Sequence, residues 1–161
     1  MASARHAVEW TVSLGIGVAR LAGPRGNAVS DALLEGLEEA LVAAERRDVR
    51  GFMLASAGPL FCPGLDLVEA RDRDRGSMRR FMERFGDALV RIFELPKPVV
   101  AAVSGHAVGG GCLLALTADR RILCRGARMW LNESRVGVPL PAEAAEVVRA
   151  AVLSLPSEET S

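Results

Sequence analysis

The chain has 161 residues, half of them hydrophobic, so it can bury one substantial core and favours a single domain over residues 1–161. Twenty Lys and Arg balance twenty Asp and Glu, which gives a formal net charge of zero. A balanced chain has no net field that attracts nucleic acid or an anionic membrane, so neither is an expected partner.

The cysteines and the termini bear on the compartment. Cys62, Cys112 and Cys124 are odd in number and widely spaced, and no histidines stand at metal-ligand spacing, so we expect reduced thiols and no metal site. The N-terminus lacks the apolar segment of a signal peptide, and no stretch is long and apolar enough to span a membrane. The final Glu-Glu-Thr-Ser is not a peroxisomal signal. We expect a cytoplasmic protein, with a mitochondrial or peroxisomal location left open.

The first third of the chain predicts strands before and after a helix. Residues 8–21 alternate apolar and polar side chains around two glycines, which predicts two short strands joined by a turn. Residues 23–27 are typical of a loop. Ser30 is an N-cap residue for a helix whose apolar side chains recur at helical spacing to Ala44. The apolar run 51–56 predicts a buried strand.

The rest of the chain continues this alternation. A stripe of Met and Phe predicts an amphipathic helix over 78–93, whose stripe belongs to the core. Further elements are expected in chain order: a strand at 98–103, a glycine-rich turn at 105–111, an apolar interior helix at 113–118, strands at 121–124 and 128–131, and a helix from 141 to 153. Strands and helices that alternate over short connections predict an α/β fold with a mainly parallel sheet.

Two glycine-bearing loops follow buried strands, at residues 61–66 and 104–111. Parallel sheets bind ligands at the carboxyl ends of their strands, and glycine lets the backbone approach a ligand closely. Gly109, Gly110 and Gly111 precede an apolar helix, where N–H groups favour an anion or a developing oxyanion, although a tight turn accounts for the same glycines. Their spacing fits neither a dinucleotide fingerprint nor a P-loop.

Two titratable side chains are candidates for catalysis. Glu133 lies between an apolar strand and a glycine turn, a pattern that by itself fits a surface glutamate. His106 is a candidate base, but no serine or cysteine at a recognisable nucleophile elbow completes a triad, so the favoured interpretation is a structural histidine.

The two loops together resemble those of the crotonase (enoyl-CoA hydratase/isomerase) superfamily. Phe-Cys-Pro-Gly-Leu-Asp at 61–66 resembles the first family loop, and the segment from Pro96 through Gly-His-Ala-Val-Gly-Gly-Gly-Cys to Asp119 resembles the second. Asn-Ala-Val-Ser at 27–30 fits the early turn, and the similarity runs in family order over about residues 8–150. The resemblance implies a crotonase-like ββα superhelix core.

The resemblance also implies what surrounds this core. Family members continue through further helices that close the acyl pocket and build a trimer. We therefore expect the C-terminal helical part to be largely missing from these 161 residues, and we expect a homo-oligomer.

The resemblance implies a site for an acyl-CoA thioester. The backbone N–H groups of Leu65 and Gly110 would bind the thioester carbonyl oxygen as an oxyanion hole. Coenzyme A enters as part of the substrate, so no separate cofactor is expected. The first loop would contact the coenzyme A portion through Pro63, Gly64, Asp66 and Leu67.

The glutamate pattern resembles an isomerase more than a hydratase. Hydratases of the superfamily use two glutamates, and the first of these positions is Leu113 here, whereas the second is Glu133. The resemblance is to single-glutamate Δ3,Δ2-enoyl-CoA isomerases of fatty-acid β-oxidation, in which one carboxylate moves a proton from C2 to C4 through a dienolate. Leu113 would be an apolar wall of the acyl pocket that excludes water.

Two alternatives remain open at this stage. One is a non-catalytic crotonase-like protein that binds acyl-CoA or partner subunits. The other keeps the oxyanion hole but changes the reaction, for example to thioester hydrolysis, because one fold supports several chemistries.

Overall fold

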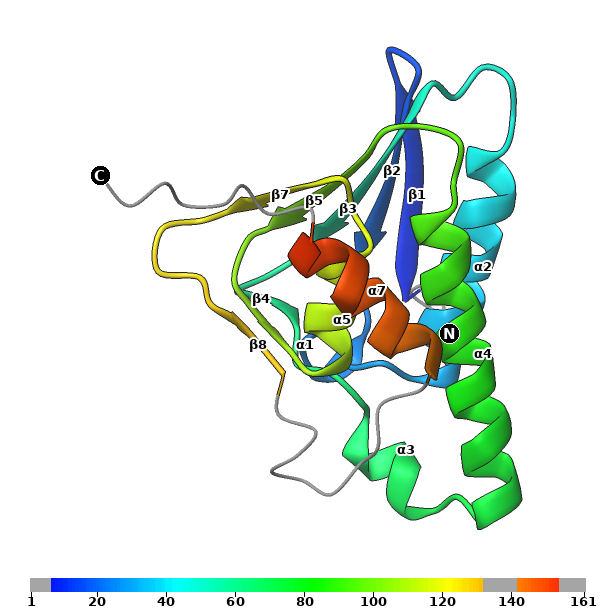
Figure 1. The fold of residues 1–161 in the computed structure, drawn as a ribbon. Helices are drawn as coiled ribbons and strands as arrows, with labels where there is room; N and C mark the ends of the chain where they lie inside the picture. Colours follow the sequence, from blue (N-terminus) through cyan, green and yellow to red (C-terminus); the bar gives the residue numbers. More distant parts are fainter. Residues whose placement is uncertain (1–6, 132–141, 154–161) are drawn as a thin grey trace, which may run out of the picture.

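Two sheets form the framework of the computed structural model, which describes residues 7–131 and 142–153 (Figure 1). The larger sheet has the order β1-β2-β3-β5-β7. Its strands are β1 (Val8–Ser13), β2 (Ile16–Leu21), β3 (Gly51–Ser56), β5 (Val99–Val103) and β7 (Arg120–Leu123). β1 and β2 form an antiparallel hairpin, whereas every later neighbour pair is parallel.

The smaller sheet is wholly parallel and has the order β4-β6-β8. Its strands are short: β4 (Leu60–Cys62), β6 (His106–Val108) and β8 (Met129–Trp130). Because β4 and β6 are parallel neighbours, the loops that follow them leave the sheet at the same end. These are the two loops that the sequence singled out as candidates for ligand binding.

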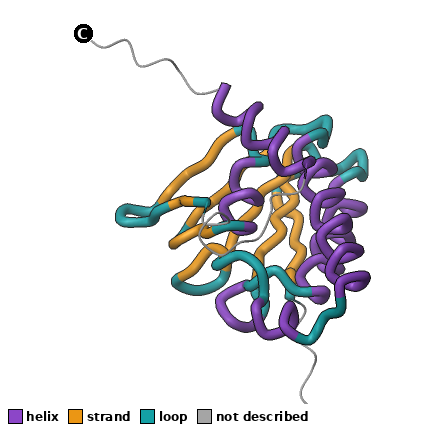
Figure 2. Tube along the Cα trace, turned by 60° about the horizontal axis from the view of Figure 1, so that its bottom comes forward, coloured by secondary structure: helices purple, strands orange, loops and turns teal. Residues whose placement is uncertain are grey.

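The helices lie outside and between the strands (Figures 1 and 2). They are α1 (Pro24–Asn27), α2 (Asp31–Ala44), α3 (Leu67–Arg71), α4 (Arg75–Phe93), α5 (Gly110–Leu116) and α7 (Ala142–Leu153). The Ser30 hydroxyl accepts a hydrogen bond from the Leu33 N–H at 3.2 Å, so the predicted N-cap of α2 is confirmed. α4 begins earlier than its apolar stripe because Asp74 caps it by accepting from the Ser77 N–H at 2.7 Å.

The core lies where α2, α4 and α5 meet the sheets. Phe81 and Phe85 of α4 are buried, so the stripe of this helix packs inward as the sequence predicted. α5 is interior, also as predicted, and Leu113 and Leu114 belong to the core. The largest side chains with almost no exposure include Phe52, Phe61, Leu33, Leu34, Leu37, Leu41, Leu54, Leu89 and Ile92.

The predicted α/β class with a mainly parallel sheet is confirmed, but four short elements were missed. α1 lies inside the predicted loop at 23–27, β4 overlaps the predicted loop at 61–66, β6 lies inside the glycine-rich turn, and α3 comes before the charged run. A segment of three to five residues is too short to establish a period of 2 or 3.6, so pairing with neighbouring chain decides its conformation.

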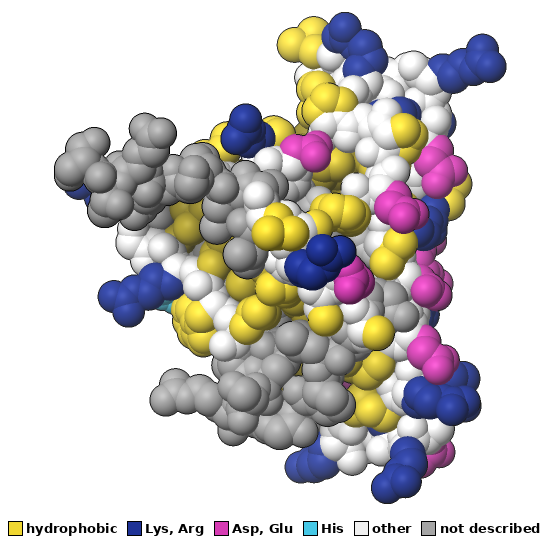
Figure 3. Space-filling view, in the orientation of Figure 1, with side chains coloured by type: hydrophobic (Ala, Val, Ile, Leu, Met, Phe, Trp, Pro, Cys, Tyr) yellow, Lys and Arg dark blue, Asp and Glu magenta, His cyan; other side chains and the backbone are white. Residues whose placement is uncertain are grey.

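Apolar side chains gather near the centre of the face seen in Figure 3, while acidic and basic side chains line the margin over α2 and α4. Among residues 7–131 and 142–153, no helix is long and apolar enough to span a membrane.

Candidate functional site

The two predicted loops touch, and glycines make the contact possible. Gly64 has φ +94°, and a Cβ atom built on it would lie 2.9 Å from the Val108 carbonyl oxygen and 3.3 Å from the Gly110 amide nitrogen. A Cβ on Gly111 would lie 2.1 Å from the Cys62 carbonyl oxygen. A side chain at either position would separate the backbones, so glycine is required for this approach.

The backbone on both sides of Leu65 is hydrogen-bonded to Val29. Val29 and Leu65 form an isolated parallel bridge, in which the Val29 N–H donates to the Gly64 carbonyl at 2.8 Å and the Asp66 N–H donates to the Val29 carbonyl at 3.0 Å. In such a bridge the N–H and C=O of the central residue point to the opposite side. The Leu65 N–H therefore points away from Val29.

Gly110 is the first residue of α5 and precedes the first hydrogen bond of that helix. This first bond runs from the Leu113 N–H to the Gly109 carbonyl at 3.0 Å, so the Gly110 N–H has no acceptor within α5. The preceding residue is fixed from the other side, because the Gly109 N–H donates to the Trp130 carbonyl at 2.9 Å. A Cβ on Gly110 would contact the ring of Phe85 at 3.3 Å.

Asp66 anchors the far end of the first loop. Its carboxylate caps α3 by accepting from the Val68 and Glu69 N–H groups at 3.0 and 3.3 Å, and it pairs with the Arg25 guanidinium, whose Nε lies 2.6 Å from Oδ2. Burial raises the pKa of this carboxyl, but the hydrogen bonds from Arg25, Glu69 and Val68 outweigh burial and hold the pKa below its ordinary value. Asp66 is therefore an ionised structural residue.

The other predicted site residues have different environments. Pro63 is half-buried, and Leu67 is 67% exposed at the start of α3. Leu113 is 1% exposed and belongs to the core cluster. Glu133 lies outside the described residues. The structure thus brings Gly64, Leu65 and Gly110 together.

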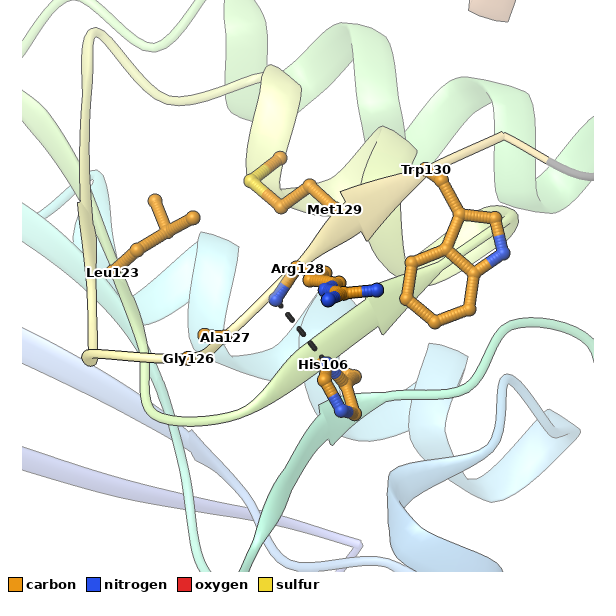
Figure 4. A pocket seen from close by; sticks show the side chains of 7 residues that line it. All are labelled: His106, Leu123, Gly126, Ala127, Arg128, Met129 and Trp130. Atoms are coloured by element: carbon orange, nitrogen blue, oxygen red, sulfur yellow. Dashed lines mark hydrogen bonds between the residues drawn. The ribbon is translucent and has the colours of Figure 1, made fainter.

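His106 and a neighbouring hollow lie apart from this contact. The His106 Nδ1 accepts from the Arg128 N–H at 3.2 Å, and its ring meets Trp130 edge-on at 5.7 Å between centroids (Figure 4). These contacts support a structural role. An open hollow of about 850 Å³ is lined by His106, Leu123, Gly126, Ala127, Arg128, Met129 and Trp130, and its lining does not include Gly64, Leu65 or Gly110.

Cys62 lies at the start of the first loop, but its thiol is not suited to nucleophilic catalysis. Burial raises its pKa to about 12, while a hydrogen bond with the Gly64 backbone lowers it to a smaller extent. A thiol with this pKa is protonated at neutral pH, and the thiolate is the reactive form. Cys62 is therefore not a candidate nucleophile.

The sequence placed Asn27 in the early turn of the family, but it predicted no contact of Asn27 or Arg25 with β4 or the first loop. Arg25 lies 41 residues from Asp66, and Asn27 lies 33 and 34 residues from the two carbonyl groups to which it donates. Single-sequence patterns report neighbours three or four residues apart, so they do not reveal pairs of this separation.

Comparison with known proteins shows which family the chain belongs to. The family model described as enoyl-CoA hydratase/isomerase matches residues 11–152. The chain belongs to this family. A rat mitochondrial enoyl-CoA delta isomerase 1 is 31% identical over 144 residues, which cover 85% of this chain and 49% of the relative. A mouse mitochondrial methylglutaconyl-CoA hydratase is 34% identical over 114 residues, which cover 70% of this chain and 36% of the relative.

Solved structures of other proteins share the fold of this enoyl-CoA hydratase/isomerase family member. An enoyl-CoA hydratase from Mycobacterium marinum superposes with a TM-score of 0.81 at 28% identity, covering 89% of this chain and 62% of the other. The predicted crotonase-like core is thus confirmed. The chain spans about half the length of the rat isomerase, and similar relatives include both isomerases and hydratases.

Proposed function

We propose that this protein is an enoyl-CoA isomerase that moves a double bond from the Δ3 to the Δ2 position of an acyl-CoA thioester. The contact between the first loop at Gly64 and the second at Gly110 is the observation that carries the proposal. It supports an oxyanion hole made of the Leu65 and Gly110 N–H groups. Pro63, Gly64, Asp66 and Leu67 would then contact the coenzyme A portion.

The chemical need for two N–H donors follows from the substrate. Removing a proton from C2 of a 3-enoyl thioester spreads negative charge onto the thioester oxygen as a dienolate. Fixed backbone N–H groups stabilise such charge without reorganising, and removal of one donor of this kind costs about 10²–10³ in rate. Two donors therefore lower the barrier to deprotonation substantially.

Glu133 is the proposed proton shuttle that takes the C2 proton and returns it to C4. The Trp130 carbonyl is hydrogen-bonded to the Gly109 N–H, next to the proposed donor Gly110. Glu133 follows Trp130 by three residues, and three residues of chain span at most about 10 Å. The length of the chain therefore allows Glu133 to lie near Gly110. Leu113 occupies the sequence position of the first hydratase glutamate, and because the site then has no second acid we propose no addition of water.

The test compares wild type with Glu133→Gln in coupled assays on 3-hexenoyl-CoA and on the corresponding 2-enoyl-CoA. Loss of a general acid-base group costs about 10²–10⁴ in rate, so we expect isomerase kcat to fall by this factor. We expect no hydratase activity in either protein. Glu39→Gln, on the exposed face of α2, is the matched control and should retain full activity.

Two results would contradict the proposal. Full isomerase activity in Glu133→Gln would remove Glu133 from the mechanism. Binding of acyl-CoA by the wild type without turnover of either substrate would instead favour the non-catalytic alternative.

A further inference from the structure

Three successive residues ahead of α2 adopt a left-handed backbone. Arg25 has φ 51° and ψ 38°, Gly26 has φ 71° and ψ 32°, and Asn27 has φ 70°. Glycine accepts this conformation, but an arginine rarely does, and consecutive left-handed residues are rarer still. A strained backbone of this kind persists only where surrounding contacts hold it, and such segments cluster at functional sites.

The side-chain hydrogen bonds from this turn reach β4 and the first loop. The Arg25 guanidinium donates to the Asp66 carboxylate, and a Cβ on Gly26 would lie 2.9 Å from Leu60 Cδ1. The Asn27 side-chain amide donates to the carbonyl groups of Leu60 and Phe61 at 3.3 and 3.1 Å. Side chains of residues 25–27 thus contact the chain both before and after residues 63–65.

The backbone that follows the turn also bonds to the first loop. Val29 bonds to Gly64 and Asp66, on both sides of Leu65. Asn27 is 1% exposed, so its side-chain amide makes these hydrogen bonds inside the protein, where water does not compete for them. The direction of the Leu65 N–H is therefore set by the segment 25–29 as well as by the loop itself.

We propose that Arg25 and Asn27 are positioning residues that aim the Leu65 N–H at the substrate carbonyl. This inference rests on the proposed function, in which Leu65 is an oxyanion donor. A displacement of about 1 Å in a catalytic group can lower the rate by about 10²-fold, so a clamp on this loop has a measurable effect on turnover.

A direct role for Arg25 in binding a coenzyme A phosphate is the competing explanation. The guanidinium is already engaged by Asp66 and lies 3.5 Å from the Glu69 carboxylate. Two carboxylates at this distance neutralise the charge that a phosphate would need. A phosphate contact would be seen in KM, whereas positioning of Leu65 would be seen in kcat.

Glycine variants separate the side chains from the backbone they hold. Arg25→Gly and Asn27→Gly keep a residue that tolerates positive φ but remove the donors, and Arg25→Lys restores a cation beside Asp66. Arg84→Ala is the matched control, because it removes an ion pair of similar geometry, 2.6 and 2.7 Å to Glu38, that links α4 to α2. Thermal unfolding compares the stability lost in each variant.

Two measurements report on the oxyanion hole. The carbonyl stretch of bound, ¹³C-labelled butyryl-CoA measures polarisation of the thioester without turnover, and steady-state kinetics on 3-hexenoyl-CoA separates kcat from KM. For Arg25→Gly and Asn27→Gly we expect kcat to fall by about 10- to 100-fold at nearly constant KM, with the stretch moving toward its value in water. Arg25→Lys should retain part of the wild-type kcat and part of the wild-type shift of the carbonyl stretch. Arg84→Ala should change neither kcat nor the stretch.

Several results would overturn the positioning role. These are a KM effect alone, a carbonyl stretch that is unchanged in both glycine variants, or a wild-type protein that does not polarise the bound carbonyl. If a glycine variant fails to fold, the comparison of Arg25→Lys with Arg84→Ala tests the positioning role through the same two measurements, kcat and the carbonyl stretch. A wild type that polarises the carbonyl but does not isomerise 3-hexenoyl-CoA refutes the proposed reaction, while the comparison of stretches still tests positioning.

Discussion

At the scale of single residues, Asp66 links the fold to the candidate site. Its side chain is 1% exposed, yet it is ionised, because Arg25 and two N–H groups at the start of α3 bind it. A buried carboxylate without such partners would be protonated at neutral pH. The loop that carries Leu65 therefore depends on one charge being present.

This dependence predicts a response to acid. Because the pKa of Asp66 is depressed in the folded protein, its contribution to stability is fully present above the unfolded pKa of about 4 and is lost as pH falls through the folded value. Urea unfolding at several pH values should show wild type losing more stability than Asp66→Asn below about pH 4.

Asp48 supplies the control for this titration. Its pKa is also lowered, chiefly by a hydrogen bond from Arg46, but its side chain is well exposed and the pair is screened by water. Asp48→Asn should therefore follow the wild-type acid profile closely. Parallel acid profiles for Asp66→Asn and wild type would show that Asp66 contributes no pH-dependent stability.

At the scale of elements, glycine decides how the two loops meet. Gly111 lies in the first turn of α5, and no side chain fits between it and the backbone of Cys62. The neighbouring Gly64 makes the equivalent approach from the first loop. The relative position of the proposed donors therefore depends on positions without side chains.

A pair of identical substitutions tests this requirement. Gly111→Ala introduces an overlap with backbone atoms, and overpacking of this kind costs about 1–3 kcal/mol or more. Gly76→Ala, in the first turn of α4, meets only side-chain atoms at 3.4 Å or beyond and should be neutral or slightly stabilising. Denaturant unfolding of the two variants measures the difference, and equal stability would contradict the close approach.

The sequence predicted long elements well and short ones poorly. α2 and α4 have enough apolar positions to establish a helical period, so their type and buried face were correct, and the apolar run at β3 was correctly predicted as a strand. β4 and β6 have three residues each, and their conformation comes from pairing with one another. The loops that follow them stay predicted ligand-binding segments, which their glycines and their position after apolar runs indicate as local signals.

At the scale of the whole molecule, the larger sheet has an open side. β7 is its last strand in the described part of the chain, and Ile122 is 65% exposed there beside the half-exposed Leu123. Open edges with exposed apolar side chains promote association between chains. The homo-oligomer expected from the sequence is therefore one we continue to propose.

Self-association can be measured directly. We expect the protein to sediment as an oligomer, and we expect Ile122→Lys to weaken this association by at least about tenfold in Kd, because a charge replaces an apolar contact at the edge. Leu14→Lys is the control, since Leu14 is 89% exposed at the tip of the β1-β2 hairpin. A monomeric wild type, or equal effects of both variants, would contradict an interface at β7.

The sequence by itself determined the α/β class, the family and the two loops where chemistry is expected, because periodicity and local motifs are encoded by neighbouring residues. Only the tertiary structure decided that Gly64 and Gly110 meet, and that Arg25 and Asn27 hold the first loop from a left-handed turn. These facts join positions about 30 to 50 residues apart, and such pairings depend on strand order and packing, which no local pattern contains.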